Sequence, residues 1–106
     1  DILLELHAIN DTLSSRDFEQ IGKTMWHQAL LMLSEIALLA QAASPEQKAS
    51  HLLRSQQALC RLHARYDIAR QLRLLDPDAE FTRQLDRQRL ELEQMGSTLT
   101  REAQGA

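Results

Sequence analysis

Glycine, proline and cysteine are scarce in this sequence of 106 residues, which holds three, two and one of them respectively. So few glycines and prolines disfavour a turn-rich β structure, and the abundance of Leu, Ala, Gln, Arg and Glu favours long helices. The single cysteine, Cys60, excludes an internal disulfide. Because unpaired cysteines are typical of reducing compartments, we expect a cytoplasmic protein.

Aromatic residues are also few, with one Trp, one Tyr and two Phe. The core must therefore be built mainly from Leu, Ile, Met and Ala. A chain of this length supports one hydrophobic core with little to spare. We expect a single domain over residues 1–106.

A long uncharged apolar run is missing as well. The most apolar segment, residues 29–43, has twelve apolar residues among fifteen, and Glu35 lies inside it. A membrane-spanning helix needs about 20 apolar residues without a charge. The segment is therefore interpreted as a buried helix of a soluble protein, and no membrane contact is expected.

Three breaks divide the chain into four predicted helices. In "ASPEQ", Ser44 is placed as an N-cap, Pro45 as the first helical residue, and Gln47 completes a capping box. In "LDPDAE", the predicted N-cap is Asp76. In "LSSRDFEQ", the predicted N-cap is Ser14, Ser15 or Asp17. The predicted helices span residues 2–13, 17–43, 45–75 and 77–102. This pattern indicates an all-α antiparallel helical bundle of three long helices and a short N-terminal helix.

The second and fourth predicted helices carry broad apolar faces. Two neighbouring stripes run along residues 17–43, the first being Phe18, Ile21, Met25, Ala29, Met32, Ile36, Leu39 and Ala43. The second stripe consists of Gly22, Trp26, Leu30, Leu33, Ala37 and Ala40. The fourth helix has a seam of alternating steps, formed by Phe81, Leu85, Gln88, Leu92, Met95 and Leu99. The double stripe and the Gln88 in the seam predict a homodimer when no partner is present.

The third predicted helix changes its apolar face near Asp67. Its first part presents Leu52, Leu59, Leu62 and Tyr66 on one side. Ile68, Leu72 and Leu75 fall on nearly the opposite side, in line with three arginines, Arg54, Arg61 and Arg65. Either the helix kinks or stops near Asp67, or its last turns meet something other than the local core.

Charge is unevenly distributed over a chain whose net charge is −3. Residues 45–75 carry six basic and two acidic side chains, whereas the segments on either side are acidic. The arginines of the third helix are compatible with RNA or DNA binding. No aromatic residue interleaves with them for base stacking, and charged helix faces usually meet water, so nucleic acid is the second hypothesis.

Motifs for chemistry are weak. No Glu-x-x-His step of a di-iron bundle is present, and no phosphate-binding loop occurs. Cys60 and His63 lie on one face of the helix and could supply two of the four ligands of a zinc site. A metal- or redox-linked bundle is therefore the third hypothesis. We expect no metal, no cofactor and no catalysis, with Cys60 a structural residue at the edge of the core.

The favoured interpretation is a non-enzymatic protein-interaction module. It is a small regulator, antiactivator or chaperone-like protein that occludes a surface of another protein, because slim bundles leave apolar stripes half covered. Trp26 is either a core residue or an interface anchor. The predicted partner-binding residues are Trp26, Leu30, Leu33, Arg54, Arg61, Arg65, Ile68, Leu72 and Leu75.

Overall fold

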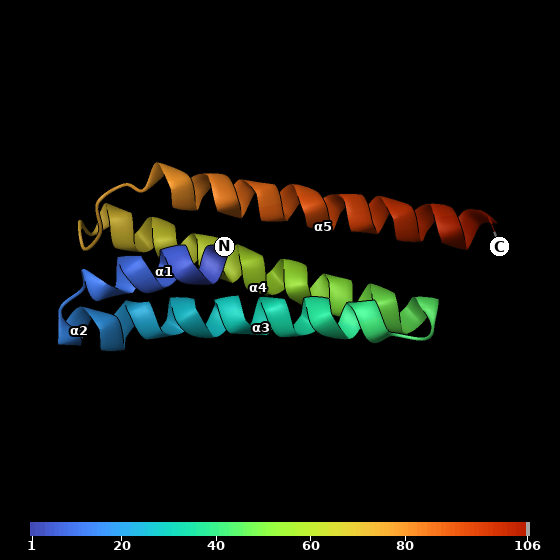
Figure 1. Ribbon diagram of the computed structural model, residues 1–106, viewed down its shortest axis with the longest axis horizontal. Helices are drawn as coiled ribbons and strands as arrows, with labels where there is room; N and C mark the ends of the chain where they lie inside the picture. The colour runs from blue at the N-terminus through green and yellow to red at the C-terminus, as the bar shows by residue number, and fades with distance from the viewer. Residues whose placement is uncertain (106) are drawn as a thin grey trace.

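Three long helices and one short helix lie side by side in the computed structural model, which describes residues 1–105 (Figure 1). The short helix α1 spans Ile2–Asp11. The first long helix has three parts without a break: α2 (Ser15–Asp17), the π-helical turn η1 (Phe18–Gly22) and α3 (Lys23–Gln41). The other two are α4 (Pro45–Gln71) and α5 (Ala79–Gly105). The predicted all-α bundle, with three long helices and a short one at the N-terminus, is confirmed.

The helix starts follow the predicted breaks in two cases and differ in the third. The Ser14 hydroxyl accepts a hydrogen bond from the backbone N–H of Asp17, and the Ser44 hydroxyl accepts one from Gln47, each at 3.1 Å. The cap of α5 is Asp78, not the predicted Asp76: its carboxylate accepts from the Phe81 N–H at 2.9 Å. The Tyr66 hydroxyl accepts from the Asp78 N–H at 3.0 Å, so a core residue of α4 determines where α5 begins.

α1 packs closely against the start of the long helix at Gly22. A Cβ atom there would lie 2.9 Å from Asn10 Oδ1, Leu13 Cδ1 and Phe18 Cδ2, so any other residue would force these side chains to move. The Asn10 side-chain amide donates to the Gly22 carbonyl at 3.2 Å. Gly22 therefore lets these side chains and α1 pack closely, and the π-helical turn η1 ends at this residue.

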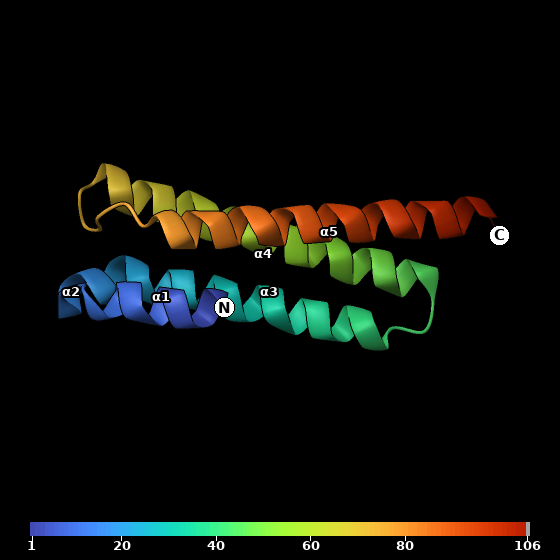
Figure 2. The same cartoon turned by 45° about the horizontal axis from the view of Figure 1, so that its top comes forward.

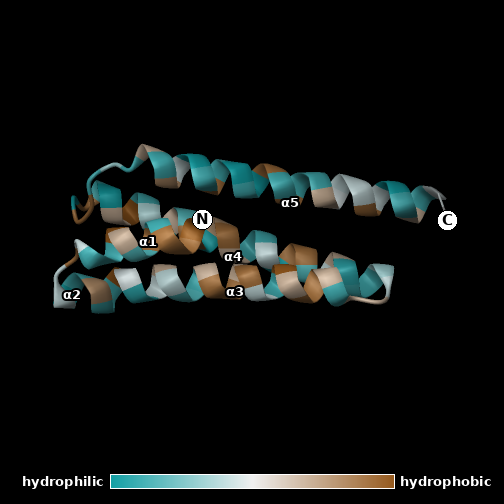
Figure 3. Ribbon diagram, viewed as in Figure 1, coloured by the Kyte–Doolittle hydropathy of each residue, from teal (hydrophilic) through white to brown (hydrophobic). Residues whose placement is uncertain are grey.

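One core runs along the centre of the bundle. Its fully buried large side chains come from every helix of the bundle: Leu6, Met25, Met32, Leu62, Tyr66, Phe81, Leu85 and Leu92. The Tyr66 and Phe81 rings meet edge to face, with centroids 4.8 Å apart. The predicted seam of the fourth helix is the face of α5 that packs inward, and its Gln88 is half-buried. α3 is visibly more hydrophobic than α5 (Figure 3).

α4 stops at Gln71, and the predicted extension to residue 75 is wrong. Leu74 N–H bonds to the Ala69 carbonyl at 2.9 Å and Arg73 N–H to the Arg70 carbonyl at 3.0 Å, which is the pattern of a Schellman C-cap. Arg73 is left-handed, with φ 59°. The sequence predicted a stop near Asp67 as one alternative, but the left-handed position is held by arginine where glycine is usual, so the stop carries no sequence signal.

Candidate protein-interaction surfaces

The fourth position of the bundle is only half occupied. α1 contacts both α3 and α5, so it lies as the fourth helix between them. It has 10 residues, whereas α3 has 19 and α5 has 27. Figures 1 and 2 both show α1 beside the first half of α3, with its N-terminus near the middle of the bundle. Over the remaining length, no helix within residues 1–105 covers α3 and α5 on the side that α1 occupies, opposite α4.

A groove of about 510 Å³ marks this half-open position. Its apolar lining consists of Ile36, Leu39 and Ala40 from α3 and Met95 and Leu99 from α5. The larger four of these side chains pack against the core from one side and remain half-exposed on the other. The polar lining consists of Lys48 from α4 and Glu91, Gln94, Thr98 and Glu102 from α5. The groove therefore has an apolar floor and an acidic rim on its α5 side.

α1 covers only part of the second predicted stripe of the long helix. Trp26 is partly covered, with its ring edge against His7 at a centroid distance of 6.3 Å. Leu30 is 42% exposed and Leu33 is half-buried. None of the three lines the groove. The sequence pattern placed Met95 and Leu99 in the seam that was one reason to expect a homodimer, but it did not predict that they line a groove together with α3.

The predicted basic and apolar stripe of α4 is only partly present. Arg54 and Arg61 are exposed, and Arg65 donates from Nη1 to the Arg61 carbonyl at 3.2 Å. None of the ion pairs formed within residues 1–105 includes these three arginines. Ile68 and Leu72 are 48% and 63% exposed, as expected for an outward face. Leu75 is a correction: it lies in the core, because the chain turns back after the left-handed Arg73.

A buried acid–histidine pair joins α3 to α4. Glu35 Oε2 lies 2.6 Å from His51 Nδ1, and the side chains are 11% and 20% exposed. The sequence showed Glu35 as a polar interruption of an apolar run, and nothing in the pattern indicated which histidine it meets. The pair orients the two helices that form the largest contact in the bundle.

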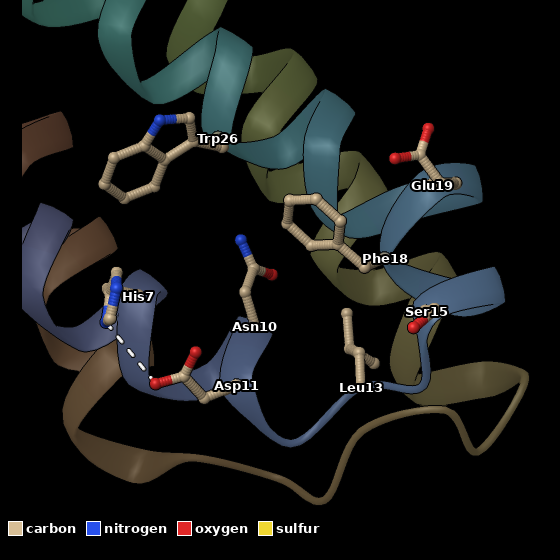
Figure 4. Close-up of a pocket in the computed structure, with 8 residues that line it drawn as sticks. All are labelled: His7, Asn10, Asp11, Leu13, Ser15, Phe18, Glu19 and Trp26. Atoms are coloured by element: carbon tan, nitrogen blue, oxygen red, sulfur yellow. Dashed lines mark ion pairs between the residues drawn. The ribbon is translucent and has the colours of Figure 1, made fainter.

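A second cavity of about 650 Å³ lies where α1 meets η1 and α3 (Figure 4). Its lining includes Trp26 and Phe18, and the Asn10 amide stands between their rings. His7 Nδ1 is 3.6 Å from Asp11 Oδ2, and both side chains are largely exposed. Ser15 lies across the cavity from His7, so its hydroxyl has no base within hydrogen-bond reach here. The cavity holds two carboxylates, Asp11 and Glu19, and the imidazole of His7, but no assembled nucleophile.

Cys60 is exposed, and its predicted place at the edge of the core is wrong. Cys60 lies outside the buried face of α4, which includes Ser55, Ala58, Leu59, Leu62 and Tyr66. Cys60 and His63 line a small cavity of about 220 Å³ together with Arg89 and Glu93 of α5. Within residues 1–105, no three His, Cys, Asp or Glu side chains are grouped so that they could hold a metal ion.

No helix in the part of the chain that the structure describes is long and apolar enough to cross a membrane. Comparison of the chain with protein-family models, curated protein sequences and solved structures finds no match.

Proposed function

We propose that this protein is a non-enzymatic protein-interaction module. It acts as a small regulator, antiactivator or chaperone-like protein that covers a surface of another protein with its apolar helix faces. The observation that carries the proposal is the half-occupied fourth position, where the α3–α5 groove exposes one side of four large apolar residues.

Energetics support this interpretation. Removing apolar surface from water stabilises a complex by about 25 cal/mol per Å², and a helix laid into an apolar groove is a common mode of peptide recognition. Leu30 and Leu38 of α3 are also exposed, at 42% and 47%, on a part of the helix surface that does not line the groove. Exposed apolar side chains gathered in a groove are typical of a surface that another chain covers.

Site-specific photo-crosslinking tests the proposal. A benzophenone amino acid replaces Ala40, which lines the groove, or Ala79, an exposed alanine at the start of α5 that does not line it. In cells that make the protein naturally, we expect a discrete crosslinked protein from position 40 and none from position 79. Equal crosslinking at both positions, or none at position 40, contradicts the proposal.

RNA or DNA binding is the second candidate function. It is favoured by Arg54, Arg61 and Arg65, whose charges are not neutralised by ion pairs within residues 1–105. Phosphate contacts produce a steep dependence of affinity on salt. Binding to mixed RNA and DNA oligonucleotides between 50 and 300 mM NaCl, compared for the wild type and Arg54→Gln/Arg61→Gln, separates this candidate from the first.

A further inference from the structure

We propose that the α3–α5 groove binds a basic amphipathic helix of a partner protein, placed end to end with α1 in the fourth position of the bundle. This inference rests on the proposed function and adds the chemistry of the partner. It follows from the shape of the groove, from the way α1 already fills the other half, and from the charge of the rim.

The shape of the groove fits a helix of about three turns. Its α5 wall runs from Glu91 to Glu102, which at about 1.5 Å per residue is close to 16 Å. α1 shows that a helix is accepted in this position: its Ile2, Leu6 and Ile9 are buried between α3 and α5. The groove continues that contact surface beyond the N-terminal end of α1, where both walls are still apolar.

The α5 side of the groove is acidic, and its two glutamates outnumber the single basic residue of the lining, Lys48 of α4. Glu91 and Glu102 are exposed, and neither belongs to the ion pairs formed within residues 1–105. They are eleven residues apart, about three turns, and therefore lie on the same edge of α5. The α3 wall, formed by Ile36, Leu39 and Ala40, carries no charge. A partner helix with cationic residues along its α5-facing edge pairs with both glutamates.

A second copy of this chain does not supply such a helix. α1 is amphipathic but carries Asp1 at its N-cap and Glu5 and Asp11 within it, so it would meet the acidic rim with like charge. α4 is the basic helix, and its apolar face is already buried in its own core. The best match is therefore a helix from a different protein, with Lys or Arg along one edge of its apolar face.

Two synthetic helices test the charge preference directly. Each is a blocked 14-residue Leu/Ala amphipathic peptide labelled with fluorescein; one has Lys at positions 2 and 13, and the other has Glu there. A peptide of the same composition with scrambled order is the control for non-specific binding. In fluorescence anisotropy at 50 mM NaCl we expect the Lys peptide to bind at least tenfold more tightly than the Glu peptide. The difference should shrink at 500 mM NaCl, because salt screens exposed charges.

Variants of the protein locate the binding. Ala40→Trp fills the groove from an exposed position and should abolish binding of the Lys peptide without changing the thermal midpoint. Glu91→Lys/Glu102→Lys should reverse the peptide preference. Asp86→Lys/Glu93→Lys makes the same charge change at exposed positions of α5 outside the groove and should preserve the preference for the Lys peptide.

Three outcomes overturn the inference, and they separate it from the proposed function. If the Glu peptide binds better and Ala40→Trp abolishes that binding, the groove is a docking site but its partner is not basic. If no peptide binds and Ala40→Trp dissociates a dimer, a second copy occupies the groove. If neither peptide binds and no self-association depends on Ala40, both the inference and the groove as the site of the proposed function are wrong.

Discussion

At the scale of single residues, Glu35 is the side chain whose role differs most from its place in the sequence. It lies in the most apolar segment of the chain and is only 8% exposed. Its carboxylate faces His51 of α4 rather than water. A polar residue buried between two helices orients them, since an unpaired group at this depth is costly.

The Glu35–His51 pair predicts that replacing one member destabilises the protein more than replacing both. Glu35→Leu alone should lower the free energy of unfolding by about 1–3 kcal/mol, because it leaves His51 without its partner. Glu35→Leu/His51→Leu should recover most of that loss, since apolar replacement of both members of a buried pair is often neutral. Urea denaturation measures both. As a control, Glu93→Gln removes an exposed pair with Arg89 and should cost less than about 1 kcal/mol. A double variant less stable than the single one contradicts the interpretation.

At the scale of secondary-structure elements, the end of α4 determines which leucines face the core. The helix stops at Gln71, the left-handed Arg73 reverses the chain, and Leu75 returns to the core at 7% exposure. Leu72, three residues earlier, is 63% exposed. Two leucines that a continuous helix would place on one face therefore lie in different environments.

This difference predicts separate effects for two serine substitutions. Leu75→Ser should lower the free energy of unfolding by about 2–4 kcal/mol, because it leaves a cavity and buries a hydroxyl. Leu72→Ser should change it by less than about 0.5 kcal/mol, as usual for exposed positions. Thermal melts followed by circular dichroism compare the two. Equal losses would show that Leu72 is also a core residue, and no loss at Leu75 would show that the return turn is not formed.

At the scale of the whole molecule, the bundle is slim, with extents of 52 × 22 × 19 Å. A long, narrow bundle has much surface for its core, and large apolar side chains remain exposed along it: Leu4, Leu30, Leu38, Leu53, Ile68, Leu72 and Leu90. Most of the α5 seam, which was one reason to predict a homodimer, faces inward, whereas its Met95 and Leu99 line the open groove. Leu30 of the second predicted stripe of α3 is exposed, and so is Leu38, which lies outside both predicted stripes.

Self-association through α3 can be measured without a partner. At tens of micromolar, light scattering should report twice the monomer mass, because Leu30 and Leu38 of two copies cover each other. Leu30→Ser/Leu38→Ser should give a monomer with an unchanged melting temperature. Leu90→Ser, an exposed leucine on α5, is the matched control and should remain a dimer. A wild-type protein that stays monomeric as its concentration rises contradicts the prediction.

Local patterns were enough to determine the helical class, the number of long helices and most of their ends. The period of the apolar residues, Pro45 after the Ser44 cap, and the scarcity of glycine each act within one or two turns of the chain. The α3 half of the groove was equally visible, since Ile36 and Leu39 belong to a predicted apolar stripe. These features are determined by neighbours in sequence, so a sequence shows them.

Contacts between distant segments decided the rest. The Tyr66 hydroxyl shifted the cap of α5 to Asp78, and the close packing of Gly22 set the place of α1. The position of α1 then determined which part of the apolar surface of α3 is covered. The uncovered part lines an open groove together with Met95 and Leu99 of α5. A helical pattern shows that a face is apolar; which helix covers it depends on the lengths and positions of elements far apart in the chain, and these are determined only when the bundle packs.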